Sequence, residues 1–148
     1  MTSEPRRDLP QLLGEARRWF EDGLLATLRA QGEAPITPTQ MQLFAMLDAD
    51  GTTVAELARR MGVTRQTVHQ AVWALIEDGF LEQVPDPASA RQRLVRRTVR
   101  GRRAHERARR ALDGLEARLG ERIGEEALGA LRAALEAPWG GPFDQGPS

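Results

Sequence analysis

Apolar residues near the start of the chain recur at intervals of three and four, the period of an amphipathic α-helix. This pattern predicts a helix from Leu9 to Ala30, which ends before Gly32 and Pro35 because both residues disfavour helix continuation. Its apolar stripe consists of Leu12, Leu13, Ala16, Phe20, Leu24 and Leu28. Trp19 and Leu25 widen this stripe beyond what one partner helix usually covers.

A second, shorter helix is predicted to begin after Thr37. Threonine is a favourable N-cap, Pro38 fits the first helical position, and Gln40 stands where a capping box requires it. The residues that face the core are Met41, Phe44, Ala45 and Leu47. The turn-forming residues 48–51 end this helix.

Two further helices follow, separated by a sharp turn. Thr53 and Glu56 form a second capping-box pattern, and this helix ends at Gly62, which can adopt the left-handed backbone of a tight turn. Thr64 can cap the next helix, which continues through Ile76. Its buried stripe is predicted to be Val68, Ala71, Val72, Leu75 and Ile76. Its opposite side carries Arg65, Gln66, His69, Gln70 and Trp73.

The hydrophobic period then becomes shorter. Residues 80–84 and 92–98 predict two short strands, and residues 85–91 between them predict the tip of a hairpin. A long helix is expected to begin at Gly101. Its apolar stripe consists of Ala104, Ala108, Leu112, Leu115 and Leu119. Gly120 and Gly124 are predicted to bracket a break before a last helix.

Two helices joined by a tight glycine turn and followed by a hairpin are the parts of a winged helix-turn-helix. The expected fold is therefore mostly α-helical, with a two-stranded β wing. Helix 64–78 would lie in the major groove of DNA, which is about 12 Å wide and admits one helix. The wing, residues 85–93, would enter a neighbouring minor groove.

Polar side chains at the start of helix 64–78 offer donors and acceptors without bulk. The hydroxyl groups of Thr64 and Thr67 suit phosphate oxygens. Arg65 could pair with guanine, and Gln66 or Gln70 with adenine. These residues are the candidate DNA contacts of the helix.

Charge is distributed unevenly along the chain, although the net charge is zero. Residues 59–110 contain 13 arginines and only five acidic residues, whereas the rest of the chain contains eight arginines and 16 acidic residues. Such asymmetry within one small protein favours a polyanion as partner. The alternative is a surface on which charges of both signs interleave.

Several classes of function are excluded by the composition. The chain has no cysteine, which excludes disulfides and thiol chemistry, and its two histidines, His69 and His105, are too few for a transition-metal site. No glycine-rich phosphate loop and no nucleophile–base pair is present, so we expect neither an enzyme nor a cofactor. Without a long apolar run or a secretory signal, the chain is expected to be cytoplasmic.

At the level of motifs the sequence resembles the MarR family of transcription regulators. The resemblance is strongest in residues 53–69, TVAELARRMGVTRQTVH, and continues in residues 75–81, LIEDGFL. The wing, DPASAR at 86–91, and LVRRTVRG at 94–101 are similar to the family's wing and to the start of its following helix. The resemblance extends over residues 9–137.

A single domain with two functional parts is what the resemblance implies. Residues 9–31 and 101–137 would be dimerisation helices, and residues 37–99 the winged-helix DNA-binding region. The ends, 1–8 and 138–148, are rich in residues that do not hold regular structure and are expected to be flexible tails. A twofold homodimer would bind a near-palindromic operator on double-stranded DNA.

In the wing, Arg91 and Arg93 are the candidate DNA contacts. Ser89 stands where the family commonly has a second acidic residue, which leaves open whether Asp86 and Arg91 form an ion pair. On the preceding helix, His69 is interpreted as a polar residue that faces the groove rather than as a metal ligand.

Other residues have more than one interpretation. Trp73 is expected to pack against the wing or the dimerisation helices rather than against a base. The arginines between positions 102 and 110 form either a solvated face or a contact to phosphates. Some relatives bind small aromatic anions between the dimerisation helices and the winged region, as the resemblance implies. Arg18, Trp19, Phe20 and Phe44 could line such an effector pocket, with core packing as the favoured alternative.

Taken together, the sequence predicts a dimeric, sequence-specific DNA-binding regulator, and the resemblance implies a repressor. An architectural or partner-recruiting protein with the same fold, which binds DNA without sequence preference, is the alternative.

Overall fold

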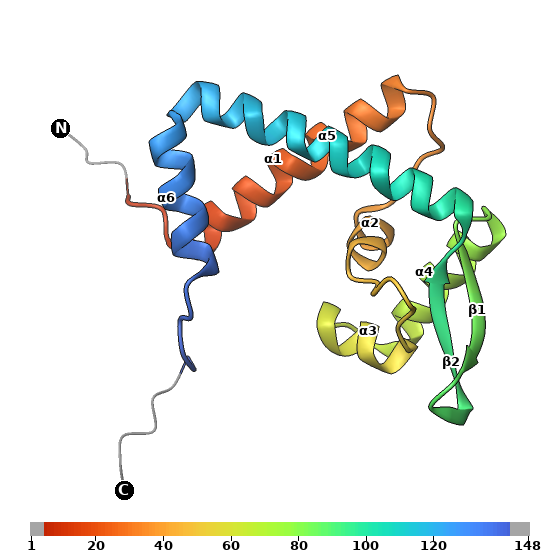
Figure 1. Cartoon of the computed structure of the whole chain (residues 1–148). Helices are drawn as coiled ribbons and strands as arrows, with labels where there is room; N and C mark the ends of the chain where they lie inside the picture. Colours follow the sequence, from red (N-terminus) through yellow and green to blue (C-terminus); the bar gives the residue numbers. More distant parts are fainter. Residues whose placement is uncertain (1–4, 143–148) are drawn as a thin grey trace, which may run out of the picture. The chain divides into compact units, whose positions relative to one another are not determined.

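The computed structural model describes residues 5–142 of the chain (Figure 1). In chain order the elements are α1 (Leu9–Ala30), α2 (Pro38–Ala45), α3 (Val54–Met61), α4 (Arg65–Glu77), β1 (Leu81–Asp86), β2 (Ser89–Arg97), α5 (Val99–Ile123) and α6 (Glu125–Glu136). The chain divides into two compact units, Met1–Leu112 and Asp113–Ser148, and the boundary lies within α5. The predicted mostly helical fold with a two-stranded wing is confirmed. Parts of the predicted tails, residues 1–4 and 143–148, lie outside the described residues.

The first four helices all begin at a side chain that accepts a hydrogen bond from a free backbone N–H group. Thr64 Oγ1 accepts from Thr67 N at 3.1 Å, as predicted. Asp8 Oδ1 accepts from Gln11 N at 2.8 Å and thereby caps α1. Asp8 belongs to the segment that was expected to be a tail, so the end of this segment has a structural role.

Of the two predicted capping boxes, the one at Thr37 is complete. Gln40 N donates to Thr37 Oγ1 and Thr37 N donates to Gln40 Oε1, both at 3.1 Å. The box at Thr53 is formed only in part, since Glu56 N donates to Thr53 Oγ1 at 3.2 Å but the Glu56 carboxylate bonds to two arginines of its own helix. A guanidinium forms stronger hydrogen bonds to a carboxylate than a backbone N–H does.

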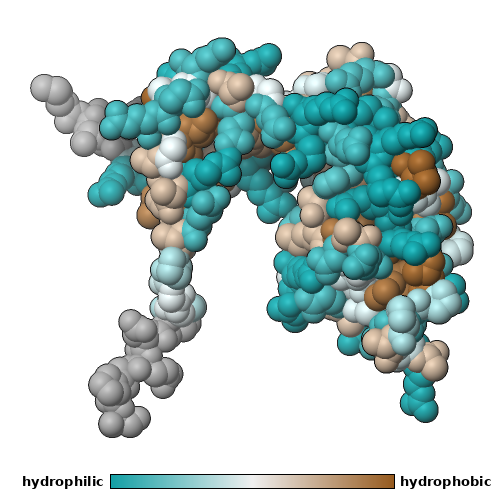
Figure 2. Space-filling model, in the orientation of Figure 1, coloured by the Kyte–Doolittle hydropathy of each residue, from teal (hydrophilic) through white to brown (hydrophobic). Residues whose placement is uncertain are grey.

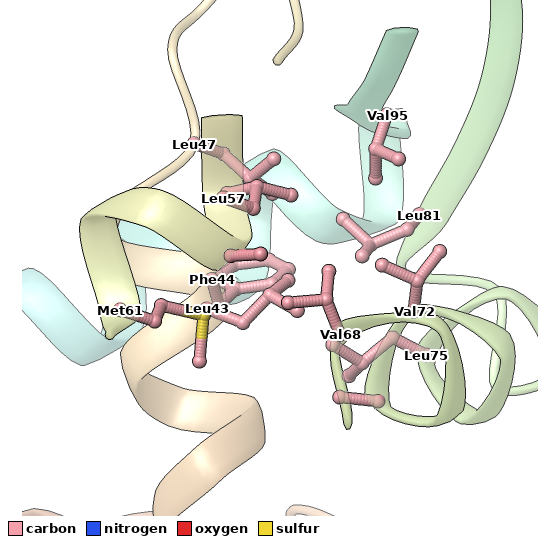
Figure 3. Packing of buried hydrophobic residues seen from close by; sticks show 12 residues of the cluster. Leu43, Phe44, Leu47, Leu57, Met61, Val68, Val72, Leu75, Leu81 and Val95 are labelled. Carbon is pink, nitrogen blue, oxygen red and sulfur yellow. The ribbon is translucent and has the colours of Figure 1, made fainter. Parts of the chain in front are cut away.

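One hydrophobic core connects α2, α3, α4 and the hairpin (Figure 3). In this view the side chains of Leu43 and Phe44 point from α2 toward those of Val68 and Leu75 on α4. The side chains that are almost completely removed from solvent are Leu43, Leu57, Leu75, Leu81, Val68, Val72 and Val95. Because these residues come from five different elements, the core fixes the position of α4 relative to the wing.

In the wing, β1 and β2 are antiparallel and paired as far as Asp86 and Ser89. The prediction that residues 85–91 form a long tip was therefore wrong, since the turn contains only the two residues between Asp86 and Ser89. Asp86 Oδ1 accepts a hydrogen bond from Ala88 N at 2.9 Å, which closes the chain in a tight turn and lets the strands continue further.

A short third segment, which the sequence did not predict, pairs with the wing at Thr52. Thr52 N donates to Val95 O and Val95 N donates to Thr52 O, both at 2.9 Å. Thr52 is buried, and its hydroxyl accepts a hydrogen bond from Asp48 N at 2.9 Å, so this polar side chain is not left unpaired. The bridge attaches the loop between α2 and α3 to β2.

Helix α5 begins at Val99, two residues before the predicted start at Gly101, and its first turn lies directly against Phe80. Thr98 N donates to Phe80 O at 3.1 Å, and Thr98 Oγ1 donates to Gly79 O at 2.6 Å. A Cβ atom on Gly101 would lie 2.0 Å from Phe80 O, which is inside van der Waals contact. Only glycine permits this approach of helix and backbone.

The second unit consists of the last part of α5 and the helix α6. The break predicted between Gly120 and Gly124 occurs at Gly124, which has φ 94°, whereas Gly120 is still helical. After α6, Trp139 Nε1 donates to Ala134 O at 2.8 Å. No helix among residues 5–142 is long and apolar enough to cross a membrane.

Substitution of Gly101 tests the contact between α5 and Phe80. Gly101→Ala should lower the free energy of unfolding by about 3 kcal/mol, because the new Cβ forces the helix away from the Phe80 carbonyl. Gly114→Ala is the matched control in the same helix, since nothing lies within 4 Å of its added Cβ. It should stabilise by up to about 1 kcal/mol. Denaturant unfolding at one protein concentration measures both, and equal effects would contradict the contact.

Candidate nucleic-acid interface

The turn between α3 and α4 presents the first turn of α4 to solvent. Gly62 ends α3 in the left-handed conformation, with φ 66° and ψ 32°, as predicted from the sequence. Thr64 then caps α4, and its hydroxyl lies 2.9 Å from the Thr67 hydroxyl. The backbone N–H groups at this helix start and the two hydroxyls together form a polar, exposed corner of the kind that contacts phosphates.

Helix α4 has one buried and one exposed face. The buried side chains are Val68, Ala71, Val72 and Leu75, as predicted except for the half-buried Ile76. The exposed side chains are Arg65, Gln66, His69, Gln70, Trp73 and Glu77. The candidate DNA contacts of this helix therefore lie together on its free face, with Thr64 exposed and Thr67 half-buried beside them.

On α3, by contrast, the arginines are neutralised within the protein. Arg60 bonds in a bidentate manner to Asp48, at 3.0 Å for both contacts, and its Nε donates to Glu56 at 2.9 Å. Hydrogen bonds and the positive charges of Arg59 and Arg60 lower the pKa of Glu56 to about 2. In the described chain Arg65 forms no such ion pair, which leaves its guanidinium available for a ligand.

The wing carries two further exposed arginines. Arg93 Nη2 makes one long hydrogen bond of 3.5 Å to Gln83 O, and Arg91 has no carboxylate partner in the described chain. Asp86 is used in the turn and does not pair with Arg91, which answers the open point about an ion pair inside the wing. In Figure 2 the outermost end of the wing is hydrophilic, with weakly hydrophobic surface directly beside it.

A cavity of about 280 Å³ lies within the first unit, between α1, α2 and the first part of α5. Its walls are mainly apolar, and its polar side chains are Glu33, Gln40, Asp78, His105 and Arg109. Phe44 lines it and also belongs to the buried core, the favoured alternative, whereas Arg18, Trp19 and Phe20 do not line it. Trp19 and Phe20 are half-buried and contact each other edge to face, with ring centroids 4.9 Å apart, and Arg18 is exposed.

Two basic side chains, Arg97 and His105, lie close to Phe44, which lines the cavity. The Arg97 guanidinium lies 5.1 Å from the Phe44 ring centroid and donates to Phe44 O at 2.5 Å, and burial lowers its pKa. The His105 ring lies 6.0 Å from the same phenyl ring. Burial, and then the charges of Arg97 and Arg109, lower the pKa of His105. A protonated His105 would add a third positive charge beside those of Arg97 and Arg109.

Sequence reasoning missed His105 and Arg97 as parts of this cluster, because their partners lie far away along the chain. A signal in the sequence that could have located the polar residues of the cavity is the spacing of His105 and Arg109. Each follows one residue after an apolar residue of the α5 stripe, Ala104 or Ala108, so both lie at the edge of its buried face.

The lowered pKa of His105 makes stability depend on pH. Below about pH 6.5 the unfolded chain takes up a proton on His105 more readily than the folded protein, so the free energy of unfolding should fall as the pH falls. Thermal unfolding between pH 7.5 and 5.5 should show a smaller decrease for His105→Gln than for the wild type. His69→Gln, at an exposed histidine, is the control and should follow the wild type. If stability fell equally with pH in the wild type and in His105→Gln, His105 would not be the cause of the pH dependence.

Comparison with known proteins agrees with this geometry. Residues 34–92 match the model of the MarR family. The matched region contains α2, α3, α4, β1 and the first part of β2, so it includes the candidate interface. The transcriptional regulator AdcR of Streptococcus pneumoniae serotype 2 (strain D39 / NCTC 7466) is 36% identical over 59 residues. That match spans 40% of this chain and 40% of AdcR.

Solved structures of MarR-family proteins share the fold well beyond this region. Wild-type MarR from E. coli has a TM-score of 0.73 at 20% identity, and the match covers 89% of this chain and 97% of MarR. CouR from Rhodococcus jostii RHA1, solved with p-coumaroyl-CoA, has a TM-score of 0.71 at 22% identity and coverages of 90% and 94%. CouR bound to a 23-mer DNA duplex has a TM-score of 0.71 at 25% identity, with coverages of 90% and 96%. The predicted MarR-like winged-helix fold is confirmed.

Proposed function

We propose that this chain is a dimeric, sequence-specific DNA-binding transcription regulator that acts as a repressor. The observation that carries the proposal is the free face of α4, where a capped helix start, an unpaired arginine and two glutamine side chains are exposed together. Members of the MarR family are transcription regulators and not enzymes, in line with the expectation that this chain has no catalytic role. The structure of CouR with a DNA duplex supports DNA as the ligand.

In this proposal α4 lies in the major groove and the wing contacts the adjacent minor groove. Arg65 pairs with guanine, and Gln66 or Gln70 with adenine, because bidentate contacts of this kind distinguish base pairs. Thr64, Thr67 and His69 complete the contacts of the helix. Arg91 and Arg93 bind phosphates or the minor groove and contribute affinity that depends on salt.

Dimerisation through the terminal helices is the second part of the proposal. In the second unit the apolar side chains of Ile123, Leu131 and Leu135 are exposed, and α6 buries none of its residues. Figure 2 shows apolar surface along this helix. Within the first unit, the start of α1 exposes Leu9, Leu12 and Leu13. Exposed apolar side chains in such number are typical of a surface that another chain covers, and a twofold dimer predicts a near-palindromic operator.

An effector has a defined place in this proposal. CouR has been solved with p-coumaroyl-CoA, an aromatic and anionic ligand, and the cavity beside Phe44 combines apolar walls with His105 and Arg109. We therefore place a small aromatic anion there, in preference to a pocket built from Arg18, Trp19 and Phe20. Such a ligand releases DNA only if it binds one arrangement of the dimer more tightly than the other.

Selection of tight-binding duplexes from a randomised pool, followed by titrations over a salt series, tests the DNA-binding function. The wild type should prefer the enriched duplex over a scrambled one by about a thousandfold. Arg65→Ala should lose about 1–3 kcal/mol on the enriched duplex and accept other bases at one position. Arg91→Ala should weaken both duplexes alike and reduce the salt dependence.

Arg118→Ala, at an exposed arginine outside the winged-helix region, is the control for the change in net charge. It should bind both duplexes like the wild type. Equal binding of the wild type to enriched and scrambled duplexes would contradict the regulator and favour the architectural alternative. Equal losses on both duplexes for Arg65→Ala would remove its role in base recognition.

The dimer is tested by sedimentation at micromolar concentration. The wild type should sediment as a dimer, and Leu131→Glu should shift it toward the monomer because a charge is buried in an apolar interface. Gln92→Glu, which introduces the same charge on the exposed wing, should leave the dimer intact. A monomeric wild type would refute this part of the proposal.

A further inference from the structure

Trp73 occupies the centre of the exposed face of α4. At 3.6 residues per turn, Gln66 and Trp73 lie within about 20° of each other around the helix and about 10 Å apart along it. His69 and Gln70 lie on either side of the line that joins them. Trp73 is 63% exposed, an unusual state for so large an apolar side chain.

Nothing in the described part of the chain holds the indole. The aromatic and cation–π contacts of these residues join Trp19 with Phe20, and Phe44 or Phe80 with neighbouring side chains, but none includes Trp73. Its N–H forms no hydrogen bond there, whereas that of Trp139 does. The expectation that Trp73 packs against the wing or the dimerisation helices thus has no support in the described part of the chain, and its ring is available to a ligand.

We propose that Trp73 determines specificity by contacting the C5-methyl group of a thymine in the outer part of each half-site. This inference rests on the proposed DNA-binding function. The thymine methyl is the apolar group that the major groove offers, so it is the feature that an indole can distinguish. An apolar ring on the midline of a groove-facing helix is well placed to contact it.

The length of the side chain fits this position. When the start of a helix is inserted into the groove, a straight helix diverges from the curved duplex toward its C-terminus, so later residues need a longer reach. Gln66 stands near the start of this midline, and the larger Trp73 stands two turns later. Glu77 follows one turn after Trp73 and is exposed, and phosphates would repel its carboxylate. Trp73 is therefore the last residue on this face of α4, toward its C-terminus, that is compatible with DNA contact.

Replacement of thymine by deoxyuracil tests the contact, because it removes the methyl group and keeps the hydrogen-bonding edge. In the duplex enriched by the wild type, one thymine per half-site should show an affinity loss of about fourfold on this replacement, the effect of losing one buried methyl group. For Trp73→Ala the same replacement should have no effect, and the starting affinity should be lower. Glu77→Gln, on the same face, should keep the wild-type sensitivity to deoxyuracil.

The possible results separate this inference from the function on which it rests. A wild type that enriches no duplex overturns both. A specific wild type whose deoxyuracil sensitivity persists in Trp73→Ala overturns only the inference, as does a Trp73→Ala variant that binds like the wild type. A loss that is equal for thymine and deoxyuracil duplexes also overturns it, and assigns the indole to the sugar–phosphate backbone. Circular dichroism of Trp73→Ala and Trp73→Leu establishes that the fold is retained.

Discussion

The packing of α4 against α2, α3 and the hairpin decides which of its side chains can meet another molecule. Val68, Val72 and Leu75 are almost completely buried, and they follow one another at helical spacing. Rotation of the helix by one residue would turn this stripe toward water and bring Arg65 or Gln66 toward the core, where an unpaired polar group is costly. The hydrophobic packing on one side of α4 thus determines which side chains are exposed on the other side, and no further interaction is needed to orient the helix.

The positive charge that this region can offer a ligand depends on which arginines are paired with carboxylates, not on the number of arginines. Arg60 is held by Asp48 and Glu56, and Arg96 is paired with Glu82 on the neighbouring strand. These ion pairs reduce the positive charge that an excess of arginine in this region implies. Arg65 and Arg91 remain available, and they lie on the two elements that a winged helix directs at DNA. The charge pattern of the sequence predicts a basic region, and the ion pairs of the structure show which of its arginines are already paired.

Most features that depend on neighbouring residues could be predicted from the sequence, with the turn at Asp86 as an exception, and features that depend on distant contacts could not. The threonine caps and the left-handed Gly62 are local, and their positions were correct. The length of the hairpin was underestimated because the turn at Asp86 was not recognised. The bridge from Thr52 to β2 and the close approach of Gly101 to Phe80 join segments that are far apart in the chain. For the candidate site, the exposed face of α4 was predicted from periodicity, whereas the polar residues of the cavity were not.

The bridge between Thr52 and Val95 has a mechanical consequence. Because it ties the loop before α3 to the strand that carries the wing, the helix pair and the wing share one hydrogen-bonded frame as well as one core. A hinge between wing and helix would have to break this frame, so the wing cannot fold away while α4 stays in place. In the proposed dimer each winged-helix region would therefore move as one rigid body, and a signal that releases DNA would have to change the distance between the two regions.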